Sequence, residues 1–136
     1  DPHPESSARM NLEKTVFAFV IVLAMTINYG FFLGEIDNPA HHNVYELFAA
    51  IVISLIATVM KLGERTQIGA LLLATSLVAD VQLIIAAIVW AMAVHVMATG
   101  LEPAVMAGIV SLSGGALLSN IVSVVLLVAE TIMGRR

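Results

Sequence analysis

The sequence contains four long apolar stretches separated by short polar segments, and this pattern restricts the folds open to the chain. The stretches cover residues 15–34, 44–62, 68–98 and 104–133. An α-helix needs about 20 mostly apolar residues to cross the ~30 Å hydrocarbon core of a bilayer. We therefore predict an all-α integral membrane protein in which four transmembrane helices form a bundle.

The composition agrees with contact with lipid. Hydrophobic residues make up 60% of the chain and charged residues only 12%, whereas soluble proteins average about 25% charged residues. The 136 residues suffice for one domain, without a separate soluble catalytic module. No basic cluster is present to bind a nucleic-acid backbone, so we expect the lipid bilayer and no nucleic acid as a partner.

The first nine residues differ from the rest of the chain. They precede Met10, which can serve as a native start. We expect residues 1–9 to be an added or disordered extension and residues 10–136 to form a single transmembrane domain.

The basic residues predict the orientation of the helices. Cytoplasmic loops of membrane proteins carry an excess of Lys and Arg. If the N-terminus is inside, all six basic residues lie on the cytoplasmic side: Arg9, Lys14, Lys61, Arg65, Arg135 and Arg136. We therefore predict a multi-pass protein of the cell (inner or plasma) membrane with both termini in the cytoplasm.

The third apolar stretch is unusual because it is long and contains two polar residues, Asp80 and Gln82. At about 1.5 Å per residue it would extend ~46 Å, more than the membrane core. We expect one long helix that tilts or protrudes, with a break into two pieces as the alternative. Gln82 lies about 200° around the helix from Asp80, and we expect it at a helix–helix contact.

Asp80 is the most informative single residue. A carboxylate near the bilayer centre costs roughly 2.5–3.5 kcal/mol on insertion scales, and no basic residue is expected at the same depth. Asp80 could line a water-filled path or bind a cation, or it could be a protonated carboxyl group that only bonds another helix. We favour a place in an ion pathway, together with Ser76, which shares its helix face.

The fourth stretch contributes further candidates. Ser113 and Asn120 are placed in the same ion pathway, and in a symmetric oligomer several copies of Asn120 would form a polar ring. Small residues also recur at every fourth position, a pattern that lets helices approach closely. We assign these residues to helix packing: Ser111, Gly115, Ser119 and Ser123.

Acidic residues are expected on the outer side. Glu35, Asp37 and Glu102 would form an outer acidic mouth, with Glu46 nearby in the pathway, and such a cluster attracts cations. The alternative is that these acids only complement the basic inner side. Candidate metal ligands are Asp80, Glu46 and His42, and a bound inorganic cation is the only ligand we expect, with no organic cofactor.

Three functions fit these features, and none is enzymatic, because catalytic motifs such as nucleophile elbows, HExxH and phosphate-binding loops are missing. The first is an oligomeric cation channel. Four helices enclose little space, so its path would be lined by polar and acidic groups of inter-subunit helices in a symmetric homo-oligomer. The second is a small proton- or ion-coupled transporter. The third is a non-transporting accessory membrane subunit.

Overall fold

A computed structural model describes residues 4–97 and 99–134, with side chains from residue 11 onward. The four long helices are α1 (Pro4–Phe32), α2 (Val44–Lys61), α3 (Gln67–Ala91) and α4 (Pro103–Met133). A short 3₁₀ helix, η1 (Pro39–His41), lies between α1 and α2, and a π-helical segment, η2 (Met92–Val96), continues α3. All four helices are long and apolar enough to cross a membrane. The predicted all-α, four-helix membrane bundle is confirmed.

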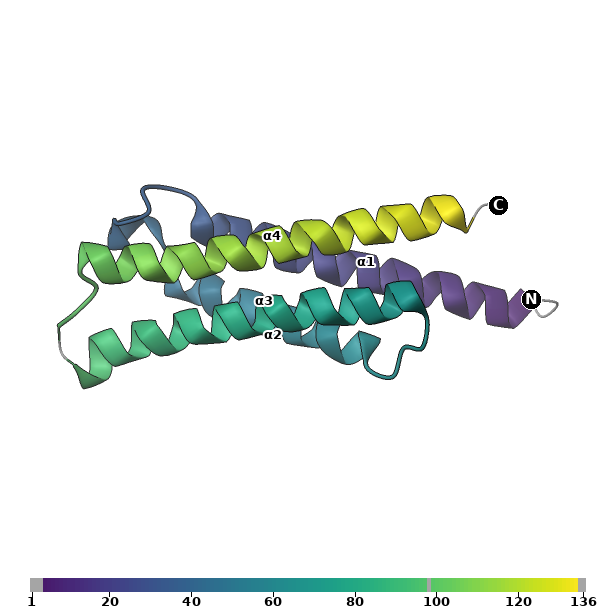
Figure 1. The fold of residues 1–136 in the computed structure, drawn as a ribbon, viewed down its shortest axis with the longest axis horizontal. Coiled ribbons are helices and arrows are strands. Elements are labelled where there is room, and N and C mark those ends of the chain that lie inside the picture. Colours follow the sequence, from purple (N-terminus) through teal and green to yellow (C-terminus); the bar gives the residue numbers. More distant parts are fainter. Residues whose placement is uncertain (1–3, 98, 135–136) are drawn as a thin grey trace.

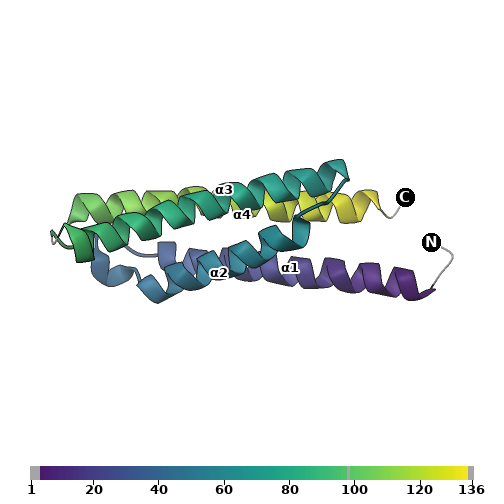
Figure 2. The same cartoon turned by 90° about the horizontal axis from the view of Figure 1, so that it is seen from below.

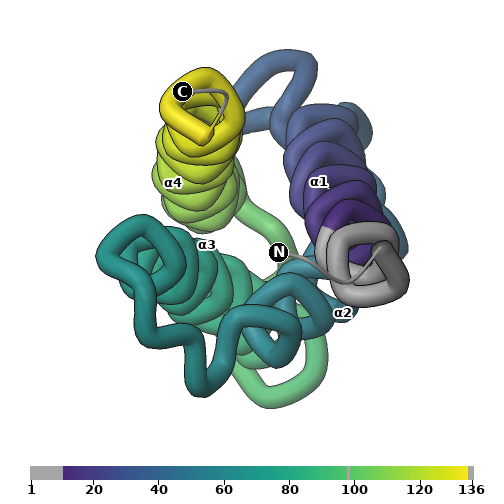
Figure 3. The backbone as a smooth tube through the Cα atoms, turned by 90° about the vertical axis from the view of Figure 1, so that its right-hand side faces the viewer, coloured from purple at the N-terminus to yellow at the C-terminus, as the bar shows by residue number. Residues whose placement is uncertain are grey.

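The helices run up and down around a common interior. In Figures 1 and 2 the two termini and the α2–α3 turn lie at one end, which we call the termini end. The α1–α2 and α3–α4 connections lie at the other, which we call the loop end. Helix α1 packs against α2 and α4, and α3 packs against the same two helices. The view along the bundle in Figure 3 shows the resulting four-cornered arrangement.

The helix ends differ from the expected boundaries mainly in α1 and α3. Helix α1 begins at Pro4, so residues 4–9 are helical and continuous with the first span. The third span is unbroken as far as Val96, since α3 passes directly into η2. At the end of η2, Met97 N donates to Met92 O at 2.8 Å. This i to i−5 bond is the mark of a π-helical turn. Residue 98, the expected end of the span, lies outside the described residues.

Local sequence signals fix several helix starts and turns. The side chain of Asn43 accepts a hydrogen bond from Tyr45 N at the start of α2, and that of Thr66 accepts one from Gly69 N at the start of α3. Such N-caps satisfy backbone N–H groups that lack a partner within the helix. Gly34 adopts a φ of 101°, which only glycine tolerates easily, where the chain leaves α1.

The buried apolar side chains form two clusters, one toward each end of the bundle. The termini-side cluster contains Phe17, Val20, Ile21, Ala57 and Leu72. The loop-side cluster contains Phe31, Leu47, Ala50, Ala79, Leu83, Ala86, Met106, Ile109, Val110 and Ala116. Large apolar side chains such as Phe19, Val52 and Val125 are exposed on the outside of the bundle, as is appropriate for a surface in contact with lipid.

Candidate functional site

Asp80 faces the interior of the bundle, where it is only 4% exposed. Its carboxylate contacts two hydroxyl groups of α2. Ser54 Oγ donates to Asp80 Oδ1 at 2.6 Å, and Thr58 Oγ1 donates to Asp80 Oδ2 at 2.5 Å. Ser54 and Thr58 are four residues apart and thus lie on one helix face. The hydrogen-bond partners of Asp80 among the described residues are therefore neutral hydroxyls and not cations.

Thr58 lies between Asp80 and a backbone carbonyl, and this position gives the site two complete hydrogen-bond patterns. Thr58 Oγ1 is 3.0 Å from Ser54 O as well as 2.5 Å from Asp80 Oδ2. A hydroxyl can donate one bond and accept two. If Asp80 is ionised, Thr58 donates to it. If Asp80 is protonated at Oδ2, its O–H donates to Thr58 Oγ1, and Thr58 then donates to Ser54 O. Either protonation state of Asp80 is fully hydrogen-bonded.

Ser76 lies one turn from Asp80 on α3, and Asn120 follows Ser119 of α4, whose hydroxyl bonds the carbonyl of Thr75 next to Ser76. Both Ser76 and Asn120 are almost completely buried, at 1% and 0% exposure. Ser76 Oγ and both side-chain amide atoms of Asn120 have no hydrogen-bond partner among the described residues. A buried polar group without a partner costs about 1–3 kcal/mol. We call Ser54, Thr58, Ser76, Asp80 and Asn120 the polar layer.

The polar layer separates the two apolar clusters. Along α3, Leu72 of the termini-side cluster and Leu83 of the loop-side cluster flank Ser76 and Asp80. Along α2, Ala57 and Ala50 of the same two clusters flank Ser54. On α3 the polar side chains are therefore bounded at both ends by packed apolar side chains, whereas on α2 Thr58 follows Ala57 toward the termini end.

Two further polar contacts join helices around the layer. Asn28 of α1 and Ser113 of α4 bond reciprocally: Asn28 Nδ2 donates to Ser113 O at 3.0 Å, and Ser113 Oγ donates to Asn28 Oδ1 at 2.6 Å. On the termini side, Thr75 Oγ1 lies 2.5 Å from Ser123 Oγ, and Ser119 Oγ donates to Thr75 O at 2.8 Å. Ser113 thus holds α1 against α4 in this structure.

Residues 41–131, about two thirds of the chain, match a family described as a family of unknown function, DUF6394. The chain belongs to DUF6394. Neither a search of curated proteins nor a search of solved structures gave a match. The part that matches DUF6394 contains the whole polar layer, whereas Asn28 lies outside it.

The small-residue series of this DUF6394 chain contributes mainly to the α3–α4 interface. Ser119 and Ser123 bond Thr75, as described above, and Gly115 lies against the amide of Gln82. A Cβ atom added at Gly115 would be 2.7 Å from Gln82 Nε2. Gln82 is thus at a helix–helix contact, where its Oε1 has no partner among the described residues. Ser111, the fourth member of the series, is exposed.

The acidic residues expected on the outer side lie at the loop end. Glu35, Asp37 and Glu102 are exposed there. Glu46 is partly buried in the first turn of α2, with its carboxylate against Gly30 of α1. It precedes Ser54, the partner of Asp80, by more than two helical turns, or about 12 Å. Glu46 is therefore remote from the polar layer.

The three candidate metal ligands are not brought together. No group of three or more His, Asp, Glu or Cys residues suited to a metal ion occurs within the described ranges. His42 is buried in the α1–α2 connection, with Nδ1 2.6 Å from Phe31 O and Nε2 2.7 Å from Glu35 O. Because a backbone carbonyl lies at hydrogen-bonding distance from each ring nitrogen, His42 holds this connection against the end of α1.

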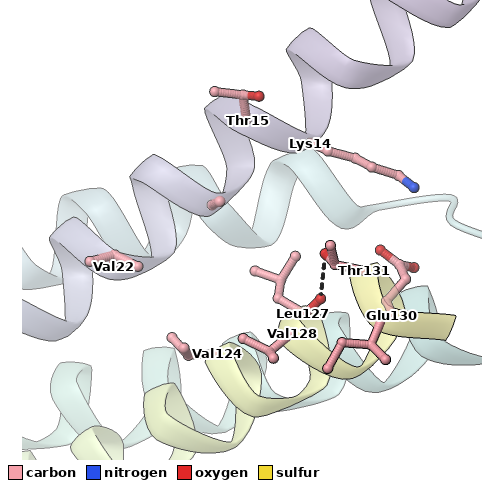
Figure 4. Close-up of a pocket in the computed structure, with 10 residues that line it drawn as sticks. Lys14, Thr15, Val22, Val124, Leu127, Val128, Glu130 and Thr131 are labelled. Atoms are coloured by element: carbon pink, nitrogen blue, oxygen red, sulfur yellow. Dashed lines mark hydrogen bonds between the residues drawn. The ribbon is translucent and has the colours of Figure 1, made fainter. Parts of the chain in front are cut away.

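A groove of about 530 Å³ lies between α1 and α4 at the termini end (Figure 4). Its walls are mostly apolar, with Lys14 on the α1 side and Glu130 on the α4 side. The hydroxyl of Thr131 donates to Leu127 O at 2.9 Å and is thus used within α4. No residue of the polar layer lines the groove, so it is a surface feature separate from Asp80.

The sequence analysis selected Asp80, Ser76, Asn120 and Ser113, all of which are buried in the bundle, but not the hydroxyl partners of Asp80. It also did not select Asn28 as a site residue. Asn28 continues a spacing of three and four residues that runs through the buried positions of α1, which are Phe17, Ile21, Ala24 and Phe31. An amide at a position in such a stripe faces the core, but only the structure reveals the stripe, because α1 is apolar on all sides.

Proposed function

We propose that this protein moves protons across the membrane, with Asp80 as the group that binds and releases the proton. The observation that carries the proposal is the position of Thr58 Oγ1 between Asp80 Oδ2 and Ser54 O. A proton carrier must exist in two protonation states without a large loss of hydrogen bonds in either. The Thr58 hydroxyl meets this requirement by reversing the direction of one hydrogen bond.

The geometry favours a path inside one bundle over a pore between subunits. Asp80, Asn120 and Ser113 are at most 4% exposed in the single chain. To line an inter-subunit channel, they would have to turn out of the core. A proton also suits the site better than a metal cation, because both carboxylate oxygens already accept hydrogen bonds from hydroxyl donors.

The two apolar clusters supply the barriers that a proton-translocating protein needs. On α3 each lies between Asp80 and one end of the bundle, and we propose that Asp80 exchanges its proton with one side only when the cluster on that side loosens. The charges support an orientation with the termini end in the cytoplasm. Lys14, Lys61 and Arg65 belong to that end, together with the acids Glu13 and Glu64, whereas the described residues of the loop end include exposed acids but no Lys or Arg.

The test is proton flux into liposomes that contain the purified protein, a trapped pH-sensitive dye and a potassium gradient made conductive by valinomycin. We expect wild-type protein to give a flux above that of empty liposomes and Asp80→Asn to abolish it. Asp37→Asn is the matched control, because this acid is exposed in a loop, and we expect it to keep the wild-type flux. Folded wild-type protein without flux, or an undiminished flux in Asp80→Asn, overturns the proposal.

A further inference from the structure

The side-chain polar atoms of Ser76 and Asn120 form no hydrogen bonds with the described residues, although both side chains are almost completely buried. The two residues lie at similar depth. Ser119, the neighbour of Asn120, donates to the carbonyl of Thr75, the neighbour of Ser76. Buried polar side chains in proteins nearly always have a protein or water partner. These two residues therefore mark a binding site within the polar layer.

The chemistry of the unpartnered atoms selects the ligand. The amide of Asn120 must both donate from nitrogen and accept at oxygen. A metal cation would satisfy the amide oxygen and Ser76 Oγ but not the amide N–H. If the amide of Asn120 is turned over, its nitrogen and oxygen exchange places, and a cation still leaves the amide N–H without an acceptor. An anion is disfavoured beside a carboxylate. Water both donates and accepts, and buried waters typically make about three hydrogen bonds.

We infer that Ser76 and Asn120 bind water, and that this water relays the proton between Asp80 and the termini end of the bundle. The inference rests on the proposed function. Ser76 precedes Asp80 by four residues, so their Cβ atoms are about 5–6 Å apart on one helix face. A bridging water with two hydrogen bonds of about 2.8 Å each can join polar atoms of two side chains that are neighbours on one helix face.

The relay step is balanced in protons and electrons. The O–H bond of protonated Asp80 breaks, and its proton passes to the oxygen of the bound water. When the termini-side cluster loosens, the bound water releases a different proton to the water outside the termini end and is regenerated. The carboxylate keeps the bonding electron pair and accepts hydrogen bonds from Ser54 and Thr58. One turn beyond Ser76 on the same face of α3 lies Leu72 of the termini-side cluster.

The experiment combines the liposome flux assay with infrared difference spectra recorded between acidic and alkaline pH in normal water and in ¹⁸O-labelled water. For wild type we expect an Asp80 carboxylic acid band and a water band that shifts with the isotope. Asn120→Leu should lose the water band, keep the acid band and lower the flux about tenfold, which corresponds to ~1.4 kcal/mol. Asn120→Ser retains a hydroxyl and should recover part of the flux. Ser111→Ala, at an exposed position on the same helix, should match wild type.

If Asn120→Leu does not fold, Ser76→Ala replaces it, with the same expectations. Wild-type flux and an unchanged water band in the folded variant overturn the inference, while loss of flux in Asp80→Asn would still uphold the proposed function. Undiminished flux in Asp80→Asn contradicts the proposed function itself. The two failures are therefore distinguishable.

Discussion

Replacing Thr58 with valine tests the arrangement around Asp80 directly, because valine keeps the shape of threonine and removes only the hydroxyl. The substitution deletes the donor to Asp80 Oδ2, which lies at 2.5 Å. We expect the protein to lose stability, and we expect the loss to depend on whether residue 80 can carry a charge. Asp80→Asn provides the comparison, because the amide mimics the neutral acid in size.

The expected magnitude follows from the kind of hydrogen bond that is lost. A bond to a charged group contributes about 1.5–3 kcal/mol and a neutral one about 0.5–1.5 kcal/mol. Thr58→Val should therefore cost about 1 kcal/mol more in the wild-type background than in the Asp80→Asn background. This value is within the largest coupling measured between transmembrane helices, about 1.7 kcal/mol.

The assay is a double-mutant cycle on reversible unfolding in mixed micelles, with Thr131→Val as the matched control. The Thr131 hydroxyl bonds the carbonyl four residues earlier, as Thr58 does, but it lies exposed near the end of α4. It should show no coupling to Asp80→Asn. Independent sites add within about 0.3–0.5 kcal/mol. A Thr58–Asp80 coupling below that range would refute the idea that Thr58 stabilises the carboxylate.

Four further predictions concern the stability of the fold and its orientation. Ser113→Ala leaves Asn28 Oδ1 without its donor and should lower the free energy of unfolding by about 1 kcal/mol; an unchanged value would contradict the role of this contact. Gly34→Ala places a Cβ at a φ of 101° and 2.6 Å from the Cβ of His41, so it should cost at least about 1 kcal/mol. Gly108→Ala meets open space in α4 and should stabilise the protein by up to about 1 kcal/mol in the same unfolding assay. A fluorescent protein fused to the C-terminus should be fluorescent, and an alkaline phosphatase fused there should be inactive, whereas an active phosphatase would contradict a cytoplasmic C-terminus.

The four helices could be predicted from the sequence because the length of an apolar stretch is sufficient to recognise a membrane span. Which face of each helix is buried could not be predicted from the sequence. Helices α1 and α3 are apolar on all sides, so the sequence alone does not indicate which side faces lipid and which faces the core. Asp80 was recognisable as a charge within an apolar run, but its position inside one bundle depends on how α2 and α3 pack.

The partners of Asp80 were hidden for a related reason. Hydroxyl groups in transmembrane helices commonly bond the carbonyl four residues earlier in their own helix, so neither Ser54 nor Thr58 stands out in the sequence. Thr58 forms that common bond with Ser54 O and also contacts Asp80. Its second contact exists only because α3 places a carboxyl group opposite it. Asn28 and Ser113 show the same limit, since 85 positions separate them in the chain.

The hydrogen bonds of Asp80 show how the bundle accommodates a costly residue. Insertion of a carboxylate costs roughly 2.5–3.5 kcal/mol at the bilayer centre, and two hydroxyl donors from α2 offset part of that cost. Because the Thr58 hydroxyl also lies 3.0 Å from Ser54 O, it can reverse its hydrogen bond with the carboxyl group. Either protonation state of Asp80 therefore keeps a hydrogen bond with each of the two hydroxyls. This arrangement, and not the presence of a membrane carboxylate alone, is the basis for proposing proton exchange at Asp80.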